Sequence, residues 1–397
     1  MSPGEIQVLL RNGELDDHPV LFNRAAAHWP CMNWIRLLSP PAPPAPPPLI
    51  PNDPLGPPGH PAGLAVEELG GIKTVFRVHR KPAATSDKVV VWEGDCLYVD
   101  DTYGNFAKWV GGSVMDDDES PLGQFDPDTH AVYADYKYFS QVFAGHDRAL
   151  ESIRFDDLGV ATVPENIAFW MGSGGSYTPC HQDCYGFNLV IQISGSKRWT
   201  LFPPDQSGAL YPTRIPYEES SVFSQVLVNQ PDHERFPLFA GAKKVEVTLR
   251  PGDVLFVPWH WWHFVESLEP SISLNQWFEL KARDTRERVS EALVRTLISA
   301  LKSQGEDGES SEQAERQDWL NPTEEVWSAQ DNLEVLQKSL QLQSGVSKEE
   351  FDADHFSTFV VNSIAGKPLR RLVDQLIDDW QTSTKGSVVS FKRQKTD

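Results

Sequence analysis

Residues 187–202 read Phe187-Asn-Leu-Val-Ile-Gln-Ile-Ser-Gly-Ser-Lys-Arg-Trp-Thr-Leu-Phe202, two apolar runs separated by Ser-Gly-Ser. Runs of this length that are rich in Val, Ile and aromatic residues and bounded by a glycine turn are typical of consecutive β-strands. Similar segments, punctuated by glycine and proline, lie on both sides: 167–171, 245–249, 254–257, 264–267 and 272–278. Seven short strands at this spacing predict a mainly β protein built on a double-stranded jelly-roll barrel.

Helical periodicity follows the last of these strands. Asp284 can cap a helix in which Val289, Leu293, Leu297 and Leu301 recur at i, i+4 spacing, so that one face is apolar. Further helices are expected at about 322–342, 347–363 and 367–382. The predicted fold class is therefore α+β, mainly β with flanking C-terminal helices.

Composition divides the chain into five segments. They are an N-terminal segment that packs on the barrel (1–38), a proline-rich linker or insertion (39–63), the barrel domain (64–283), a helical region (284–382) and a flexible tail (383–397). More than half of residues 40–61 are proline, which favours polyproline II and suits either an exposed linker or a ligand for SH3 or WW modules. Within the barrel domain, we expect strands at 73–78 and 88–92 and a loop at 102–123 that contributes to specificity, as does 203–244.

His181 and Asp183 lie two residues apart in Thr178-Pro-Cys-His-Gln-Asp183, and His263 follows 80 residues after Asp183. On a strand, residues i and i+2 point the same way, so His181 and Asp183 can bind one metal ion. Two imidazoles and one carboxylate are the ligand set of mononuclear non-haem Fe(II) sites. The spacing therefore predicts an iron site whose third ligand, His263, comes from a neighbouring strand. His260 would face away from it, because it is three residues from His263.

The 397 residues carry a formal net charge of -21, with 35 Lys and Arg against 56 Asp and Glu. Binding a phosphate backbone requires clustered basic residues, so this balance argues against DNA and against a tRNA substrate. An acidic surface favours basic peptide or protein partners, or serves solubility alone.

The four cysteines, Cys31, Cys96, Cys180 and Cys184, form neither a C-x-x-C pair nor a disulfide framework. We expect reduced thiols, which are typical of an intracellular compartment. The first residues show no secretory signal, and no apolar run is long enough to cross a membrane. The expected location is the cytoplasm, with the nucleus as an alternative because of the short basic patch at 392–395.

Three stretches of the predicted barrel resemble the JmjC group of Fe(II)- and 2-oxoglutarate-dependent oxygenases, which have a cupin barrel. These stretches are Phe169–Asp183, Asn188–Gln206 and Pro251–His263. The resemblance extends over residues 18–38 and 64–280, and the proline-rich run has no counterpart in it. Within the group, the chain resembles the small hydroxylase type and members that associate with a small heat shock protein. The resemblance therefore implies a small heat shock protein as a partner.

The family pattern assigns residues to the pocket of 2-oxoglutarate. Lys197, in Gly-Ser-Lys-Arg, would bind the distal carboxylate with the help of Thr178, although a surface lysine is the alternative. Asn188 and Asn275 match amides that line the cofactor pocket. Tyr133 matches a carboxylate-binding tyrosine, with a register that the sequence leaves open.

The same pattern makes His181, Asp183 and His263 the Fe(II) ligands. It implies decarboxylation of 2-oxoglutarate to succinate, coupled to hydroxylation of a protein or peptide substrate. No zinc finger or other reader segment accompanies the barrel, which disfavours histone demethylation. The alternative is a non-catalytic protein of the stress response that binds a small heat shock protein on a JmjC scaffold. In either case, the C-terminal helices could form a homodimer, or the apolar stripe at 284–301 packs on the protein's own barrel.

Overall fold

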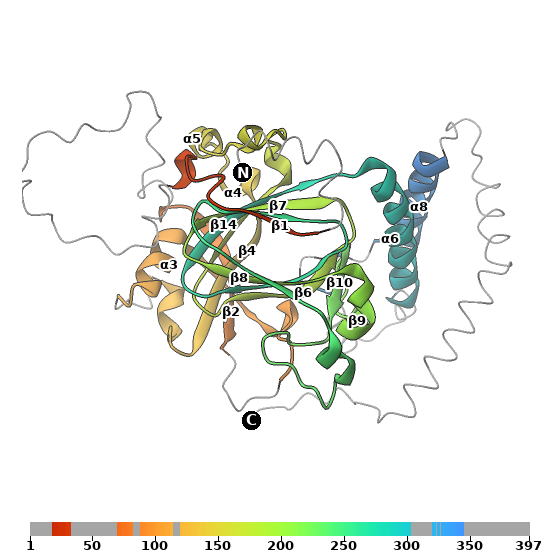
Figure 1. The fold of residues 1–397 in the computed structure, drawn as a ribbon, viewed down its shortest axis with the longest axis horizontal. Helices are drawn as coiled ribbons and strands as arrows, with labels where there is room; N and C mark the ends of the chain where they lie inside the picture. The colour runs from red at the N-terminus through yellow and green to blue at the C-terminus, as the bar shows by residue number, and fades with distance from the viewer. Residues whose placement is uncertain are drawn as a thin grey trace, which may run out of the picture.

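The computed structural model describes residues 18–32, 70–81, 88–113, 120–302 and 320–344, except 323 and 326. Two antiparallel β-sheets face each other in a jelly-roll barrel, as predicted (Figure 1). In spatial order, the eight-stranded sheet contains β1 (Val20–Phe22), β12 (Val254–Val257), β7 (Phe187–Ser194), β14 (Ser271–Phe278), β5 (Ile167–Gly172), β4 (His130–Tyr138), β2 (Lys73–Arg80) and β3 (Leu97–Thr102). The six-stranded sheet contains β11 (Val245–Leu249), β8 (Lys197–Phe202), β13 (Trp262–Ser267), β6 (Tyr177–Asp183), β10 (Ser221–Ser224) and β9 (Pro212–Thr213).

The largest apolar core lies on the outer face of the eight-stranded sheet. Strand alternation sends every second residue of β7 and β14 to this face, where side chains of α3 (Tyr103–Val110), α4 (Phe139–Val142) and α5 (Asp147–Glu151) join them. On that face the two strands contribute the buried Gln276 and five buried apolar residues: Leu189, Ile191, Ile193, Ile272 and Leu274. The alternate positions line a cavity inside the barrel, and three of them are polar: Asn188, Ser273 and Asn275.

The described part of the N-terminal segment packs on the barrel. β1 pairs with β12 at one edge of the eight-stranded sheet, from Val20 opposite Phe256 to Phe22 opposite Val254. Trp29, a few residues further along, is 1% exposed and belongs to the same outer core. The segment therefore covers a sheet edge that would otherwise offer free backbone groups.

The predicted helix after the barrel is present as α6 (Lys281–Lys302) and begins three residues before Asp284. Asp284 does not cap it: its carboxylate accepts hydrogen bonds from the backbone N–H of Leu280 and of Gly186, which ties the helix to the barrel. Of the predicted apolar stripe, Val289 packs with α8 (Ala329–Ser344), which lies beside α6 in Figure 1. Leu293 and Leu297 are 48% and 59% exposed.

The helix predicted at about 322–342 begins later, at Ala329, because Ser328 provides its N-cap. The Ser328 hydroxyl oxygen accepts from the backbone N–H of Asp331, 3.1 Å away. The helices predicted at 347–363 and 367–382, the proline-rich run and the tail lie outside the described residues. No helix in the described part of the chain is long and apolar enough to span a bilayer.

Two local predictions are wrong. Residues 88–92 form no strand, because side chains satisfy their backbone: the Tyr177 hydroxyl accepts from the N–H of Val91, and the Asp95 carboxylate from that of Trp92. The expected loop at 102–123 contains the helix α3, whose Phe106 and Trp109 are buried in the outer core. Its described residues do not line the cavity of the barrel.

Candidate metal and cofactor site

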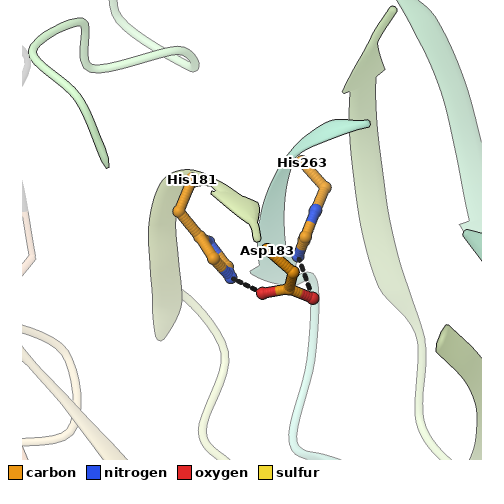
Figure 2. Close-up of side chains that lie close together, drawn as sticks. All are labelled: His181, Asp183 and His263. Atoms are coloured by element: carbon orange, nitrogen blue, oxygen red, sulfur yellow. Dashed lines mark ion pairs between the residues drawn. The ribbon is translucent and has the colours of Figure 1, made fainter. Parts of the chain in front are cut away.

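Two neighbouring strands of the six-stranded sheet, β6 and β13, bring the three predicted metal ligands together. His263 on β13 pairs with His181 on β6, and Asp183 lies two residues further along β6 on the same face. Donor atoms of the three side chains all lie within 4.8 Å of one another (Figure 2). Nε2 of His181 is 3.5 Å from Oδ1 of Asp183, and Nε2 of His263 is 4.0 Å from Oδ2 of the same carboxylate.

Hydrogen bonds on the far side of each imidazole fix its orientation. Nδ1 of His181 lies 2.8 Å from the carbonyl oxygen of Pro179, and Nδ1 of His263 lies 2.9 Å from that of Trp261. A carbonyl can only accept, so Nδ1 carries the proton in both rings and the lone pair of Nε2 points toward Asp183. Metal-binding histidines generally show this arrangement.

The electrostatics of the three side chains also suit a cation. Burial, and then the nearby His263, lower the pKa of His181 to about 4, so its imidazole is neutral and can donate a lone pair at neutral pH. The indole N–H of Trp277 donates to Oδ2 of Asp183 at 3.1 Å and holds the carboxylate in place. A donor set of two neutral imidazoles and one carboxylate fits Fe(II).

His260 does not join these three side chains, in agreement with the sequence prediction. It precedes β13, stacks on Trp259, and its Nε2 lies 3.3 Å from the carbonyl oxygen of Cys184. Cys184 and Cys180 are both buried free thiols, as expected. Within the described residues, His181, Asp183 and His263 form the sole group with three donors close enough for one metal ion.

A β-bulge turns Thr178 toward the same cavity as His181. Between the pairs Val265–Thr178 and His263–His181, β13 advances two residues while β6 advances three. The extra residue lets two side chains of odd separation share one side of the strand, and Pro179, which has no N–H for the ladder, lies within the bulge. Thr178 and His181 both line the cavity as a result.

Four residues form one end of the cavity, which we call the deep end: Lys197, Tyr133, Thr178 and Ser273. Lys197 is 1% exposed, and its Nζ donates to the hydroxyls of Ser273 at 2.9 Å and Tyr133 at 3.3 Å. The Tyr133 hydroxyl is also 3.4 Å from that of Thr178. Burial lowers the pKa of Lys197 to about 7, against the opposing charge of Asp135.

The deep end fits a ligand carboxylate. Among the described residues, no carboxylate lies within 4.0 Å of the Lys197 ammonium, so a buried cation lacks an ionic partner. Such a group is costly unless an anion pairs with it, and a dicarboxylate would supply one. Ser273 was not singled out in the sequence, because a strand serine carries no distinguishing signal.

The two predicted amides line the cavity and bond to one another. The Asn275 side-chain amide donates to Oδ1 of Asn188 at 3.0 Å, and its own oxygen accepts from the indole N–H of Trp170 at 2.5 Å. Both hydrogen-bonding groups of Asn275 are therefore engaged within the protein. Asn275 holds Asn188 in place at the cavity wall.

The metal-ligand candidates and the deep end belong to one cavity of about 830 Å³. Its lining also includes residues that sequence reasoning missed: Glu93, Tyr98, Tyr136, Tyr138, Glu218, Asn321 and Glu324. The three tyrosines lie on β3 and β4, and the other four residues lie outside the strands. No ligand spacing in the sequence marks them as residues of the cavity.

Comparisons with known proteins agree with this architecture. A family model described as a cupin-like domain matches residues 106–284. The chain is 43% identical over 258 residues to HSPB1-associated protein 1 of Homo sapiens. The aligned stretch covers 64% of this chain and 50% of that protein. The chain is 37% identical over 149 residues to lysine-specific demethylase 8 of Danio rerio, covering 36% of this chain and 35% of that protein.

A third relative is named for a JmjC domain. JmjC domain-containing protein D of Dictyostelium discoideum is 41% identical over 111 residues, covering 27% of this chain and 24% of that protein. The chain spans about half the length of the human relative that it matches. The jelly-roll barrel, the family match and these relatives agree, and the chain contains a cupin-like domain of the JmjC type.

Proposed function

We propose that this protein is an Fe(II)- and 2-oxoglutarate-dependent dioxygenase that hydroxylates a protein or peptide side chain. One observation carries the proposal: the His-Asp-His donor set and the unpaired buried cation of Lys197 line the same cavity. A metal ligand set alone suits many reactions, whereas its combination with a carboxylate-binding cation suits a keto-acid cosubstrate. The cupin-like domain and the similarity to a lysine-specific demethylase support oxygenase chemistry in general.

The proposal gives each group a task. His181, Asp183 and His263 would hold Fe(II) from one side, which leaves room for 2-oxoglutarate and dioxygen. When bound, iron with its keto-acid supplies the oxidising power that amino-acid side chains lack. Lys197, with Ser273 and Tyr133, would bind and orient the distal carboxylate of 2-oxoglutarate.

Aromatic side chains beside the histidines would exclude water. Phe223 lies 5.9 Å from the His181 ring between centroids, and Trp199 stacks on His263 at 5.7 Å. Exclusion of water protects reactive intermediates from side reactions and strengthens the electrostatic contacts within the site. We expect the substrate C–H bond to approach from the part of the cavity that these rings leave open.

The test is turnover without a substrate. The full chain, supplied with Fe(II), ascorbate and 2-oxoglutarate, should form succinate slowly, and His181→Ala should reduce this rate by more than about 100-fold. His260→Ala is the matched control, since His260 lies in the same sequence motif as His263 and contacts none of the three ligand candidates; it should retain the rate. Absence of succinate and of 2-oxoglutarate binding in the unmodified protein would rule the proposal out.

A second function has its own support. The relative with 43% identity is named for an association with HSPB1, so a regulatory role in the stress response, through binding of a small heat shock protein on a non-catalytic scaffold, is the alternative. Purified HSPB1 and the full chain should then form a complex in light scattering. A complex that survives His181→Ala, in a protein that forms no succinate, would favour this alternative.

Two further expectations complete the proposal. The exposed Leu293 and Leu297 on α6 support a homodimer through the C-terminal helices. Substitution of both leucines by lysine should convert the dimer to a monomer in light scattering.

The cytoplasm is the proposed location of the protein, with the nucleus as the alternative. Fluorescence microscopy of the tagged full chain distinguishes the two.

A further inference from the structure

Three glutamates form an acidic wall of the cavity: Glu93, Glu218 and Glu324. Glu93 follows the irregular segment at 88–92, Glu218 precedes β10, and Glu324 precedes α8. Glu218 lies three residues before Ser221, whose Cα pairs with that of Asp183. The acidic wall is therefore close to the candidate metal ligands along the sheet.

The carboxyl groups of the wall have few cationic partners among the described residues. Among the described residues, no cation lies within ion-pairing distance of Glu93 or Glu218. The nearby Arg77 already pairs with Asp135 at 2.8 Å, and Lys137, which also lines the cavity, lowers the pKa of Glu93 without forming an ion pair with it. The ionic contact of Glu324 with Arg295 is long, 4.0 Å, and its carboxylate also accepts a hydrogen bond from the backbone of Glu219. Burial first, and then the charges of neighbouring carboxylates, raise the pKa of Glu93 to about 7 and of Glu218 to about 8.

Asn321 supplies an independent sign of a missing ligand. Its side chain lines the cavity, is 2% exposed, and uses its amide N–H to bond Glu218. Its Oδ1 has no hydrogen-bond donor in the described part of the protein. A buried acceptor without a donor is costly, so an N–H group from a ligand would satisfy it.

Three tyrosine side chains line the cavity together with the acidic wall. Tyr98, Tyr136 and Tyr138 line the cavity with 44%, 45% and 36% of their surface exposed, and the Tyr98 hydroxyl donates to the backbone oxygen of Glu93. Tyr136 has a φ of 49°, the left-handed region that a bulky residue rarely adopts, within the β-bulge of β4. Aromatic faces attract cations, so these rings match the charge preference of the wall.

We infer that the acidic wall and Asn321 select a cationic side chain, lysine or arginine, of a peptide substrate. The inference rests on the proposed function, because it takes the cavity to be the substrate site of the oxygenase. Carboxylates and an amide oxygen supply acceptors for several N–H donors, and only ammonium and guanidinium groups offer such donors together with a positive charge. The wall does not fit a second metal ion, since only the triad groups three donors closely among the described residues.

The test is peptide binding to the full chain by calorimetry. Four glycine-flanked peptides differ only in their central residue: arginine, lysine, and the neutral analogues citrulline and norleucine. At least one cationic peptide should bind about tenfold or more tightly than its neutral analogue. The arginine and lysine arms show whether a guanidinium or an ammonium is preferred.

Substitution assigns the preference to the wall. In Glu93→Gln/Glu218→Gln, the cationic and neutral peptides should bind within about twofold of each other, since the charge is gone and the shape is kept. Glu151→Gln removes an exposed carboxylate on α5, outside the cavity lining, and should keep the preference. Thermal melting of each variant confirms that it is folded.

Three results would overturn the inference: equal binding of cationic and neutral peptides, no binding of any peptide, or a preference that survives in the double variant. None of these measurements requires turnover. A protein that prefers the cationic peptides but forms no succinate would lose the proposed function while keeping the charge preference. Failure of the charge preference and failure of the proposed oxygenase function are therefore distinguishable.

Discussion

The deep end and the acidic wall belong to one cavity but are built for opposite charges. At the deep end, Lys197 is a buried cation held by neutral hydroxyls, with no carboxylate in ionic contact among the described residues. At the wall, Glu93 and Glu218 are carboxylates without a cationic partner in the same set of residues. The contrast indicates two ligands, an anionic one at the deep end and a cationic one at the wall.

The two regions also differ in how the chain assembles them. Lys197 and Ser273 lie on barrel strands, where pairing with neighbouring strands fixes the backbone. The wall joins Glu93, Glu218 and Glu324, which lie outside the strands and far apart in the sequence. We therefore expect substitutions to affect the two regions separately, and the following experiments test that separation.

The largest effect is expected at Glu291 of α6, which anchors the segment that carries Glu218. Its buried carboxylate accepts from the Arg214 guanidinium twice and from the backbone N–H of Ser220. Glu291→Ala leaves Arg214 without its partner and should reduce the free energy of unfolding by about 3 kcal/mol. Cationic-peptide binding should weaken while the KM for 2-oxoglutarate stays unchanged.

Chemical denaturation and steady-state kinetics measure these two quantities. Glu334→Ala, which removes an exposed carboxylate on α8, is the control and should change stability by less than about 0.5 kcal/mol. Should the KM for 2-oxoglutarate rise as much as the peptide affinity falls, the two regions would not be separable.

Lys197→Met should raise the KM for 2-oxoglutarate by about 10- to 100-fold, because a charged hydrogen bond contributes about 1.5–3 kcal/mol. Arg198→Met is the matched control: Arg198 is the next residue and its guanidinium bonds Glu266 instead. Arg198→Met should leave the KM for 2-oxoglutarate unchanged. Charge preference for peptides should persist in both variants, and its loss in Lys197→Met would contradict the separation.

The pH dependence of 2-oxoglutarate binding should report Lys197. Its pKa is about 7 in the ligand-free protein, because burial disfavours the charge, and a bound carboxylate would raise this pKa. Above pH 7 binding therefore takes up a proton, and affinity should fall with rising pH by up to about tenfold per unit.

Calorimetry between pH 6 and pH 9 measures this slope. Tyr133 and Asp135 also face the ammonium, but burial raises the pKa of Tyr133, so the phenol stays neutral across this range. Lys197→Met should bind weakly with a flat profile. An unchanged slope in that variant would assign the proton to another group.

The smallest effect is expected at Tyr98, beside the acidic wall. Tyr98→Leu removes an aromatic face and should weaken cationic-peptide binding by about two- to fivefold, since an exposed cation–π contact contributes about 0.5–1 kcal/mol. Tyr98→Phe keeps the ring and should bind nearly as the unmodified protein does. Equal losses in both variants would point to the hydroxyl group and its bond to Glu93 instead.

Regular strands were the most predictable part of the fold. The segments 245–249 and 254–257 match β11 and β12 residue for residue, because Pro251 and Gly252 interrupt the apolar pattern between them. The segment at 88–92 has the same apolar composition but is not a strand. Its backbone is bonded by the side chains of Tyr177 and Asp95, which no local pattern reveals.

For the site, the sequence alone determined the residue types and the spacing of His181, Asp183 and His263, because strand alternation is a local property of the backbone. Only the tertiary structure decided that Lys197 is buried without an ionic partner. It also decided that Glu93, Glu218 and Asn321 line one cavity. The physical reason is that burial and unpaired charge depend on contacts between segments distant in the chain, and periodicity carries no information about such contacts.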